Sequence, residues 1–489
     1  MLQIPAFPGE TSHFYEVTVN GIPCPVRPVR VSAMPFNRGW PGFQRPIKQT
    51  EIAYYVDFYS DGPVKLQVSS RKNYSKALVR PLAKNIKLSE KDGKIDFSLA
   101  ENGFYVLELD DEHCCLHIFN KRLTAEKVTE KECTKYYGPG IHQVGIVNVE
   151  SNDIIYIDKE AVLYGGFFGE NVSNVRIFGG GVIDNEKEER YVPENDPGNL
   201  DTVGCIRFKY SKDIRIEDVI CKDSALWTVS LYGCDRVNIH QIAMIGNWRY
   251  NSDGLDVVNS SDITLTDSFI RVFDDIVTIK GFDLYHTEKH PVENIKVENC
   301  VFWCDWGRTC EVGIETLAPY YRNIDFNQCH CIHNSTAVLD IRNGYLTDIS
   351  NVSFRNLTIE YSDQWKPDVF ELGPGEEPLD NPDYIFSTEF NPGDRIGVAD
   401  LFFADNLKFW FGNKTKEFGT THDVLVDNIR IYSDPACPKP RIHIASAEKD
   451  GKLHDFTFNN IFINGKKVEN YEEEFRIDIE DDVKNVKFE

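Results

Sequence analysis

A short unit recurs between residues 173 and 488 and constrains the fold more than any other feature. Each copy places an Asn or Asp in front of an alternating apolar run. The copies lie at residues 173–177, 212–216, 235–239, 261–265, 293–297, 322–326, 350–354, 422–426, 454–458 and 484–488. From Ile214, their first apolar residues follow one another at intervals of 23, 26, 32, 29 and 28 residues. Short strands that repeat roughly every 20–35 residues, with little helical periodicity, indicate a parallel β-solenoid.

The polar residue of each copy is expected at the turn into the strand, where an Asn or Asp side chain can bond its own backbone. Cys300 and Cys329 each lie five residues after the first apolar residue of a copy, Ile295 and Ile324. Because side chains alternate between the faces of a strand, equivalent positions on adjacent coils should stack. We therefore expect both thiols to point inward and to serve packing.

Residues from about 12 to 120 follow a different pattern of short strands separated by turn residues. Three of the expected strands cover residues 13–19, 52–58 and 103–109. Regularly spaced short strands with alternating apolar residues are typical of a β-sandwich. We therefore predict an all-β chain with two domains. An N-terminal β-sandwich covers residues 1–134, and a right-handed parallel β-helix covers residues 135–489.

The repeat is interrupted between about residues 362 and 420. This segment contains four Pro residues before residue 390 and two Trp residues, Trp365 and Trp410. A long irregular insertion in a compact fold is commonly a lid or a binding loop. A loop without function is the alternative.

The formal charge of the chain is −24. Nucleic acids and anionic membranes are bound by basic patches, so this charge argues against both as partners. No apolar stretch approaches the roughly 18 residues of a membrane-spanning segment. A local Arg or Lys could still hold an acidic sugar.

Thirteen cysteines are scattered through apolar, strand-like runs, and none has the paired C-x2-C spacing of a zinc site. No metal or other cofactor is expected. The N-terminal residues lack the basic start and the apolar run of a signal peptide. Reduced, buried thiols fit a cytoplasmic protein. If a leader has been removed, the protein would instead be secreted.

Two acidic segments stand about one coil apart. Residues 251–256 read Asn-Ser-Asp-Gly-Leu-Asp, and the pair Asp274-Asp275 begins 21 residues after Asp253. Two adjacent side chains cannot both point out of a regular strand, so the pair is expected at a bend or a strand end. Crowded carboxyl groups of unequal acidity are what hydrolysis of a glycosidic bond requires.

These segments and the surrounding repeats resemble the polygalacturonase-like β-helix glycosidases, glycoside hydrolase family 28, and their dextranase-type relative, family 49. Family 28 carries the motifs NTDGxD, DD, GHG and RIK. Residues 251–256 match the first motif with Ser for Thr, and Asp274-Asp275 match the second at the expected spacing. The β domain in front of the solenoid is more similar to the dextranase type.

The last two motifs of the family differ in this chain. Residues 305–311, Asp-Trp-Gly-Arg-Thr-Cys-Glu, follow the DD pair by one coil without a GHG, and Asp340-Ile341-Arg342 matches RIK loosely. In polygalacturonases RIK holds the uronate carboxylate, whereas dextranase-type members work with three carboxylates and without the His. The resemblance implies a glycosidase and leaves the choice between a neutral and a uronic sugar open.

The resemblance also implies a role for each aspartate. Asp274 would be the general acid, and Asp253 with Asp275 would activate the water, giving inversion by single displacement. Like charges held close together raise the pKa of one of them. Inverting sites keep two carboxyl groups roughly 6.5–9.5 Å apart, which leaves room for the water. The sequence does not decide which aspartate keeps the proton.

Several nearby residues could contact the sugar. Aromatic rings offer an apolar face to a pyranose, and cationic groups donate hydrogen bonds to hydroxyls or to a carboxylate. The expected contacts are Asn251, Asp256, Lys280, Trp306, Arg308, Glu315 and Arg342. Weaker candidates are Trp248, Arg249, Trp303 and Glu311.

We therefore expect an enzyme that hydrolyses an O-glycosidic bond of an oligosaccharide or polysaccharide, with a homo-oligomer as one possible assembly. One alternative is a polysaccharide lyase on the same solenoid, in which the aspartates hold Ca²⁺ and an Arg or Lys abstracts a proton. The other is a solenoid that binds glycans without catalysis.

Overall fold

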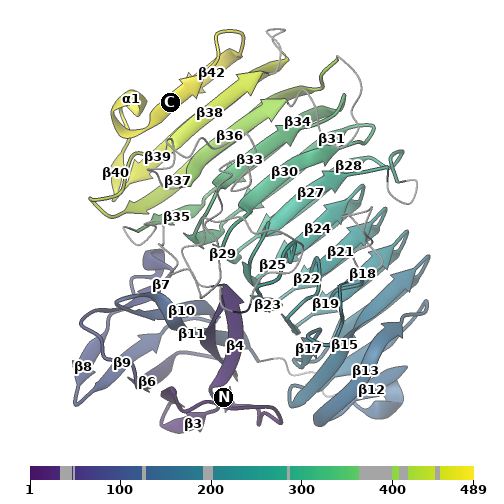
Figure 1. The fold of residues 1–489 in the computed structure, drawn as a ribbon, viewed down its shortest axis with the longest axis vertical. Coiled ribbons are helices and arrows are strands. Elements are labelled where there is room, and N and C mark those ends of the chain that lie inside the picture. The colour runs from purple at the N-terminus through teal and green to yellow at the C-terminus, as the bar shows by residue number, and fades with distance from the viewer. Residues whose placement is uncertain are drawn as a thin grey trace, which may run out of the picture.

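The N-terminal region of the computed structural model consists of two antiparallel-rich sheets (Figure 1). The structure describes residues 1–32, 47, 50–123, 128–190, 202–283, 287–362, 399–406, 417–446 and 452–489. The first sheet contains β1 (Leu2–Gln3), β4 (Arg27–Ser32), β5 (Thr50–Ser60), β7 (Ala77–Arg80), β10 (Gly103–Leu109) and β11 (Asp111–Arg122). The second contains β2 (Tyr15–Val19), β3 (Ile22–Cys24), β6 (Val64–Ser70), β8 (Ser89–Lys91) and β9 (Lys94–Leu99).

The two sheets enclose an apolar core, as in a sandwich. On β2 the side chains of Tyr15, Val17 and Val19 are buried, and the residues between them are more exposed. This alternation is what a strand with one face toward a core requires. The strands predicted at 13–19, 52–58 and 103–109 correspond to β2, β5 and β10. The predicted sandwich is confirmed.

Residues from Lys135 onward form a parallel solenoid, in which each coil contributes up to three strands and pairs with the coils before and after it. Sheet 1 contains β13 (Gly140–Asn148), β15 (Ala161–Glu170), β18 (Ile206–Lys209), β21 (Val229–Tyr232), β24 (Leu255–Val258), β27 (Val277–Gly281), β30 (Arg308–Thr316), β33 (Ala337–Asn343), β36 (Asp400–Asn406), β38 (Arg441–Ser446) and β41 (Arg476–Ile479).

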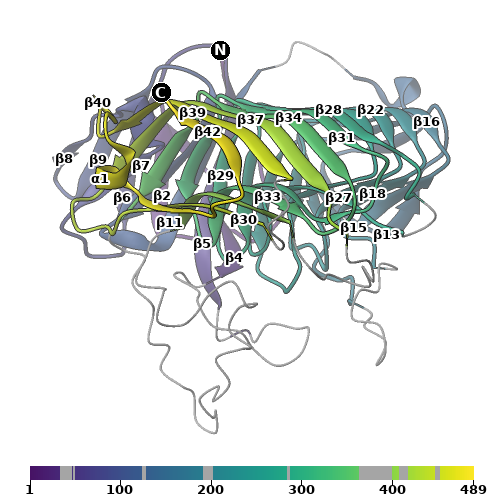
Figure 2. The same ribbon diagram turned by 90° about the horizontal axis from the view of Figure 1, so that it is seen from above.

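Sheet 2 lies on the opposite side of the solenoid from sheet 1 (Figure 2). It contains β12 (Lys135–Tyr137), β14 (Ile154–Ile157), β16 (Ser173–Phe178), β19 (Lys212–Glu217), β22 (Asp235–His240), β25 (Ser261–Thr266), β28 (Val292–Glu298), β31 (Tyr321–Asn327), β34 (Asp348–Arg355), β37 (Thr420–Ser433), β39 (Leu453–Ile463) and β42 (Lys484–Phe488). The recurring units of the sequence are the strands of this sheet from β16 onward, so the predicted parallel β-helix is confirmed.

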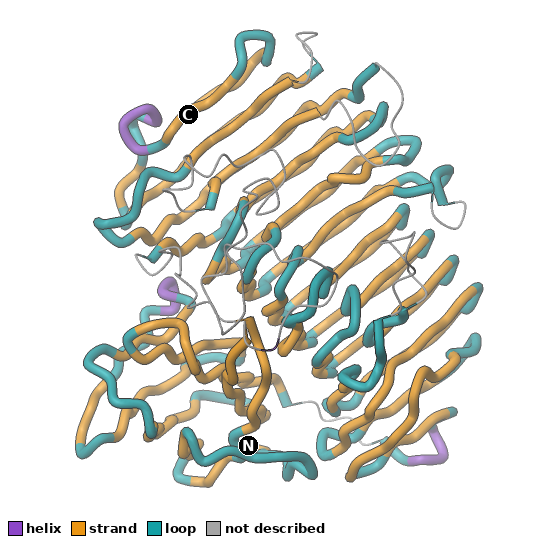
Figure 3. Tube along the Cα trace, viewed as in Figure 1, coloured by secondary structure: helices purple, strands orange, loops and turns teal. Residues whose placement is uncertain are grey.

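Sheet 3 connects sheet 2 back to sheet 1. It contains β17 (Val182–Asp184), β20 (Ile220–Lys222), β23 (Ala243–Asn247), β26 (Phe269–Val272), β29 (Val301–Cys304), β32 (His330–His333) and β35 (Thr358–Tyr361). The remaining elements are β40 (Lys466–Lys467), η2 (Leu82–Lys84), η3 (Glu130–Glu132) and α1 (Tyr471–Glu474). In the part of the chain that the structure describes, helices are confined to these few short turns (Figure 3). Within the described residues, no helix has the length and apolarity needed to cross a membrane.

In most sheet 2 strands, the Asn or Asp before the apolar run adopts a left-handed backbone, with φ of 56° at Asp262, 59° at Asn294 and 57° at Asn323, and on β22 Arg236 takes this place with φ of 54°. This conformation is tolerated best by Asn, Asp and Gly. The side chains bond across coils rather than to their own backbone. Asn294 Nδ2 donates to Asp262 Oδ1 at 2.8 Å, and Asn323 Nδ2 donates to Asn294 Oδ1 at 2.9 Å. The recurring polar residue therefore both shapes the turn and links neighbouring coils.

The solenoid interior is a continuous apolar core from Val149 to Phe475. Cys300 and Cys329 are both fully buried in it, as predicted from their spacing. Most of the segment from 362 to 420 lies outside the described residues, as do Trp365 and Trp410. Within that segment, β36 pairs with β33 and β38, so it adds a strand to sheet 1 that the sequence pattern did not reveal.

The N-terminal sheets pack against the outer face of sheet 3. Phe104 and Phe119 meet Phe269 at ring-centroid distances of 5.9 and 5.3 Å. A buried ionic network lies in the same interface. Arg80 Nε is 2.9 Å from both carboxylate oxygens of Glu108, and Arg80 Nη1 is 2.5 Å from Glu360 on β35. Since Glu360 belongs to the solenoid, Arg80 ties the two regions together.

Replacing Arg80 by Met would leave Glu108 and Glu360 buried without their shared cation. We expect the free energy of unfolding to fall by about 3–5 kcal/mol, because an uncompensated buried charge is costly. Urea unfolding followed by fluorescence measures the change. The control is Arg236→Met, which removes an exposed guanidinium 2.8 Å from Asp213 and should cost far less, because exposed ion pairs contribute little to stability. Equal losses in the two variants would contradict a special role for the buried network.

Candidate active site

Asp274 and Asp275 occupy the bend between β26 and β27, where sheet 3 turns into sheet 1. Asp253 occupies the equivalent bend one coil earlier, between β23 and β24. Leu255 on β24 pairs with Val277 on β27, which brings Asp253 level with Asp275. The backbone N–H of Gly254 donates to the carbonyl of Asp275 at 2.8 Å. We call these bends, with Asp253, Asp274 and Asp275, the acidic corner.

Lys280 on β27 reaches back into the acidic corner. Its Nζ lies 3.0 Å from Asp253 Oδ2, 3.0 Å from Asp256 Oδ1 and 3.9 Å from Asp275 Oδ2. The ammonium also lies 4.4 Å from the centre of the Trp227 ring. A cation shared by several carboxylates allows them to approach one another without the full cost of repulsion.

Arg308 approaches Asp275 from the following coil. Its backbone N–H donates to Asp275 Oδ1 at 2.9 Å. Its guanidinium lies 3.6 Å from Asp275, from Glu311 and from Asp340. Asp275 is therefore held from both sides, by Lys280 of its own coil and by Arg308 of the next.

Asp274 has different neighbours. Asn251 Nδ2 lies 3.4 Å from Asp274 Oδ2, and Arg190 Nη2 donates to Asn251 Oδ1 at 2.9 Å. The half-buried indole of Trp306 stacks on Phe273, the residue before Asp274, with ring centroids 5.2 Å apart and ring planes within 2°. Asp274 thus lies beside an amide, whereas Asp275 lies beside two cations.

These surroundings give the three aspartates unequal acidity. Burial, together with the charges of Asp253 and Asp275, raises the pKa of Asp274 well above its usual range. Burial also opposes ionisation of Asp275, but Arg308 and Lys280 outweigh it and lower the pKa of Asp275. The pKa of Asp253 is raised to about 6, because burial outweighs the attraction of Lys280. Asp274 is therefore biased toward its protonated form, and Asp275 toward its ionised form.

Glycine at position 307 is required by the close approach of the next coil. A Cβ on Gly307 would lie 2.5 Å from Asp274 C, Asp275 N and Asp275 Oδ1. Separations this short between heavy atoms force the backbone to move. The absence of a side chain at Gly307 therefore helps to fix the position of the two adjacent aspartates.

The other expected sugar contacts lie farther along sheet 1. Glu315 is largely buried, and its charge raises the pKa of both Asp253 and Lys280. Arg342 is fully buried, and its Nη2 is 2.9 Å from Asp405 Oδ2 on β36. The structure therefore brings Asn251, Asp256, Lys280, Trp306, Arg308 and Glu315 around the three aspartates, and it pairs Arg342 with the following coil.

Two of the weaker candidates have structural roles. Trp303 is wrong as a sugar platform. It is fully buried between sheet 3 and the N-terminal sheets, with the Arg271 guanidinium 3.7 Å from its ring centre. The reason is that β29 presents it on the face that the sandwich covers. Trp248 donates from Nε1 to Asp223 at 2.9 Å, so its ring is fixed at the corner of an earlier coil.

Sequence reasoning missed Trp227 and Arg190. The register places Trp227 one coil before Asp253, since Val229 pairs with Leu255. If this strand register had been known, Trp227 would have been identified as a neighbour of Asp253. Arg190 comes from a stretch outside the repeats and carries no such signal. Its guanidinium donates to the Tyr250 carbonyl at 2.6 Å as well as to Asn251.

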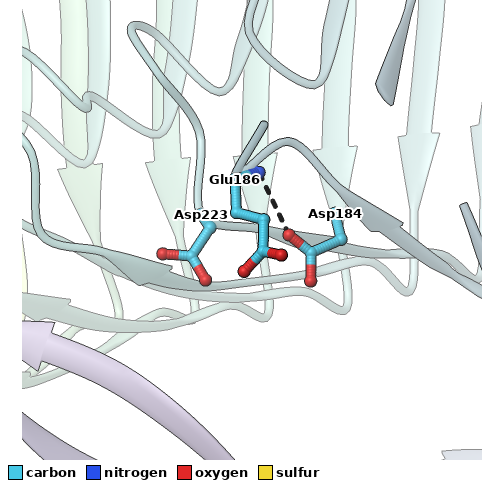
Figure 4. A group of neighbouring side chains, drawn as sticks. All are labelled: Asp184, Glu186 and Asp223. Carbon is cyan, nitrogen blue, oxygen red and sulfur yellow. Dashed lines mark hydrogen bonds between the residues drawn. The ribbon is translucent and has the colours of Figure 1, made fainter. Parts of the chain in front are cut away.

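A second acidic group lies at the same corner on the preceding coils (Figure 4). Asp184, Glu186 and Asp223 bring their carboxylate oxygens within 4.8 Å of one another. Lys222 Nζ lies 2.7 Å from Asp184 and 2.6 Å from Asp223, so a lysine already supplies positive charge there. The line of carboxyl groups at this edge of sheet 1 therefore extends beyond the acidic corner.

Comparison with known proteins identifies relatives of this chain. The chain is similar to a polygalacturonase of Gossypium barbadense, with 24% identity over 155 residues, covering 27% of this chain and 38% of that protein. It is also similar to a probable rhamnogalacturonase B of Aspergillus terreus, with 25% identity over 172 residues, covering 34% of this chain and 30% of that protein. The chain thus spans less than two fifths of the length of these relatives.

Among solved structures, Dex49A from Penicillium minioluteum has a similar fold, with a TM-score of 0.60 and 14% identity, over 99% of this chain and 96% of that one. A family model described as glycosyl hydrolases family 28 matches residues 115–367, which is more than half of the chain and includes the acidic corner. The protein therefore belongs to glycosyl hydrolase family 28.

Proposed function

We propose that the protein hydrolyses an O-glycosidic bond by single displacement with inversion. One observation carries this proposal. Two adjacent carboxyl groups, Asp274 and Asp275, have pKa values displaced in opposite directions. Inverting glycosidases need one carboxyl group that gives a proton and another that takes one. Family membership supports the same reaction class.

In the proposed reaction, Asp274 donates its proton to the oxygen of the leaving sugar. Asp253 and Asp275 accept the proton of a water molecule that attacks the anomeric carbon from the opposite face. Lys280 keeps Asp253 ionised and oriented from 3.0 Å. The contact from Asn251 to Asp274 Oδ2 leaves the other oxygen of Asp274 to carry the transferred proton. No metal enters this sequence.

The position of Lys280 favours hydrolysis over a Ca²⁺-dependent lyase reaction. Its ammonium lies among Asp253, Asp256 and Asp275, where a cation bound by these carboxylates would lie. Two like charges at that point would repel each other. Activity that resists a chelator and yields no unsaturated product supports hydrolysis. A solenoid that only binds glycans gives no explanation for the opposed acidities of Asp274 and Asp275.

The proposed partner is a carbohydrate, and a small oligosaccharide imported whole would suit the enzyme. All thirteen cysteines are free thiols, and ten of them are buried, which supports a location in the reducing cytoplasm. A homo-oligomer remains a prediction, to be tested by light scattering.

Replacing Asp274 by Asn removes the proposed proton donor while conserving shape. A screen of defined glycans first identifies an oligosaccharide that the wild-type protein cleaves. We expect the rate at which the variant hydrolyses it to be at least about 100-fold lower. Proton NMR of the wild-type reaction should show the inverted anomer as the first product. Asp213→Asn, which changes an exposed carboxylate on sheet 2, is the control. Retention of configuration would refute single displacement.

The pH dependence follows from the proposed roles. Catalysis requires ionised Asp253 and protonated Asp274, so kcat/KM should rise as the pH increases through about 6 and fall at higher pH as Asp274 loses its proton. Lys280→Gln removes the charge that lowers the pKa of Asp253, so the acidic limb should move to higher pH. Lys280→Arg, which conserves the charge, is the matched control. An acidic limb that is unchanged in Lys280→Gln would contradict these assignments. Because the carboxyl groups interact, the limbs of the profile report pKa values of the whole group.

Gly307→Ala should displace Asp274 and Asp275, because its Cβ has no room beside their backbone. We expect kcat/KM to fall by at least about tenfold, since small misplacements of catalytic groups are costly. The free energy of unfolding should fall by about 1–3 kcal/mol. Gly62→Ala is the control, because a Cβ there meets no atom within 4 Å. Wild-type kinetics in Gly307→Ala would show that the approach of this coil does not position the aspartates.

A further inference from the structure

The turn after β17 and the bend after β23 are joined by two arginines that donate in opposite directions. Arg190 belongs to the turn, and its Nη1 donates to the Tyr250 carbonyl of the bend at 2.6 Å. Arg249 belongs to the bend, and it donates back to the carbonyls of Glu186 and Glu188 at 2.8 and 3.1 Å. Each segment therefore restrains the other.

The turn after β17 is itself anchored to later parts of the solenoid. The Glu188 carboxylate accepts from the backbone N–H groups of Val203 and of the residue after it, at 2.7 and 2.8 Å. Asn185 Nδ2 donates to the same carboxylate at 2.9 Å, and Asn185 Oδ1 accepts from the Ala225 N–H at 2.8 Å. Arg190 therefore extends from a turn whose position is fixed by several hydrogen bonds.

The second contact of Arg190 is with the side-chain amide of Asn251. Arg190 Nη2 donates to Asn251 Oδ1 at 2.9 Å, and Nδ2 of the same amide lies 3.4 Å from Asp274 Oδ2. The backbone of Asn251 is left-handed, with φ of 51°, which Asn tolerates better than most residues. The amide therefore lies between a guanidinium and the proposed general acid, with one end toward each.

The guanidinium determines which end of the amide faces Asp274. The two ends of an amide are similar in shape, but the oxygen only accepts hydrogen bonds and the NH₂ group only donates them. A guanidinium has donors and no acceptor, so the end of Asn251 that faces Arg190 has to be the oxygen. The NH₂ end is then the one that faces Asp274.

This orientation matters for the proton that Asp274 has to give away. An N–H that donates to Oδ2 stabilises the carboxylate formed by proton transfer more than it stabilises the neutral acid, because hydrogen bonds to ionised acceptors are stronger. It also leaves Oδ1 to carry the proton. With the amide reversed, the Asn251 oxygen would accept the proton of Asp274, and the protein would retain a proton that the leaving sugar needs.

We propose that Arg190 is a positioning residue for proton transfer, and that it acts by holding the Asn251 amide with its N–H toward Asp274. This inference rests on the proposed glycosidase function and adds to it a residue that lies outside the recurring units and more than sixty residues before the acidic corner.

The test compares two substrates that differ in their need for an acid. The first is the glycan that the wild-type protein cleaves in the screen. The second is a dinitrophenyl glycoside of the fragment that supplies the anomeric carbon, whose leaving group departs without a proton. In Arg190→Met, we expect kcat to fall by at least about tenfold for the glycan and by less than about threefold for the dinitrophenyl glycoside.

Both rates come from one preparation of the variant, so their ratio does not depend on the fraction of protein that is folded. Cleavage of the glycan at the wild-type rate would overturn the inference. Equal losses with the two substrates would also overturn it, because they would indicate a general structural defect rather than a defect in proton transfer.

Three further variants test the route through Asn251. Arg190→Lys keeps a donor without an acceptor, so it should restore most of the glycan activity that Arg190→Met loses. Arg249→Met removes the other arginine between the two segments, and its ratio of the two rates should match that of wild type. In Asn251→Ala there is no amide to orient, so adding Arg190→Met should cause no further loss. An undiminished further loss in that double variant would show that Arg190 does not act through Asn251.

The pH profile gives an independent readout. Burial lowers the pKa of Arg190, and the charges of Tyr250, Asp253 and Asp274 oppose this shift, so the guanidinium interacts with the acidic corner. Arg190→Met removes this positive charge and the fixed N–H, both of which favour ionised Asp274. The pKa of Asp274 should therefore rise, and the basic limb of kcat/KM should move to higher pH. A basic limb that stays in place would contradict the positioning role.

Failure of the proposed function has a different signature. In that case wild type and Asp274→Asn would be indistinguishable across the glycan screen. Cleavage that depends on Asp274 but is unaffected by Arg190→Met refutes the role of Arg190 and leaves the hydrolase intact.

Discussion

The parallel pairing of one coil with the next is the constraint on which the rest of the molecule depends. In a parallel ladder, equivalent residues of successive coils lie side by side about 4.8 Å apart. The pairing of Leu255 with Val277, and of Val277 with Cys310, therefore places Asp253, Asp275 and Arg308 in one line across three coils. No single coil contains the site. It exists only because the hydrogen bonds of sheet 1 fix the register.

Two cations, rather than solvent, compensate the negative charge at this corner. Lys280 binds Asp253 and Asp256, and Arg308 contacts Asp275 through both its backbone N–H and its guanidinium. Asp274 is adjacent in sequence to Asp275 but faces Asn251. The two neighbouring carboxyl groups thus differ in acidity because their side chains leave the bend toward different surroundings. On a regular strand, one of two adjacent side chains would point into the apolar core. At a bend, both carboxyl groups can lie outside the core and still have different neighbours.

Much of this architecture could be predicted from the sequence. The recurring Asn or Asp with an alternating run located sheet 2, and the 21-residue spacing of Asp253 and Asp274 indicated their convergence. Strand β36 was missed because the sequence on either side of it does not contain the recurring unit. Trp303 was misjudged because alternation along β29 gives its face but not what covers that face. The partners of Asp274 and Asp275 depend on side-chain directions at a bend, which no periodic pattern encodes.

The hydrogen bond from the Arg308 backbone to Asp275 has a consequence for biosynthesis. During translation, the aspartates leave the ribosome more than thirty residues before the group that completes their environment. A nascent chain that has folded only as far as β27 therefore carries the acidic residues without their final acidities. The acidic corner is therefore complete only at a definite length of the growing polypeptide, after the coil that contains Gly307 and Arg308 has folded.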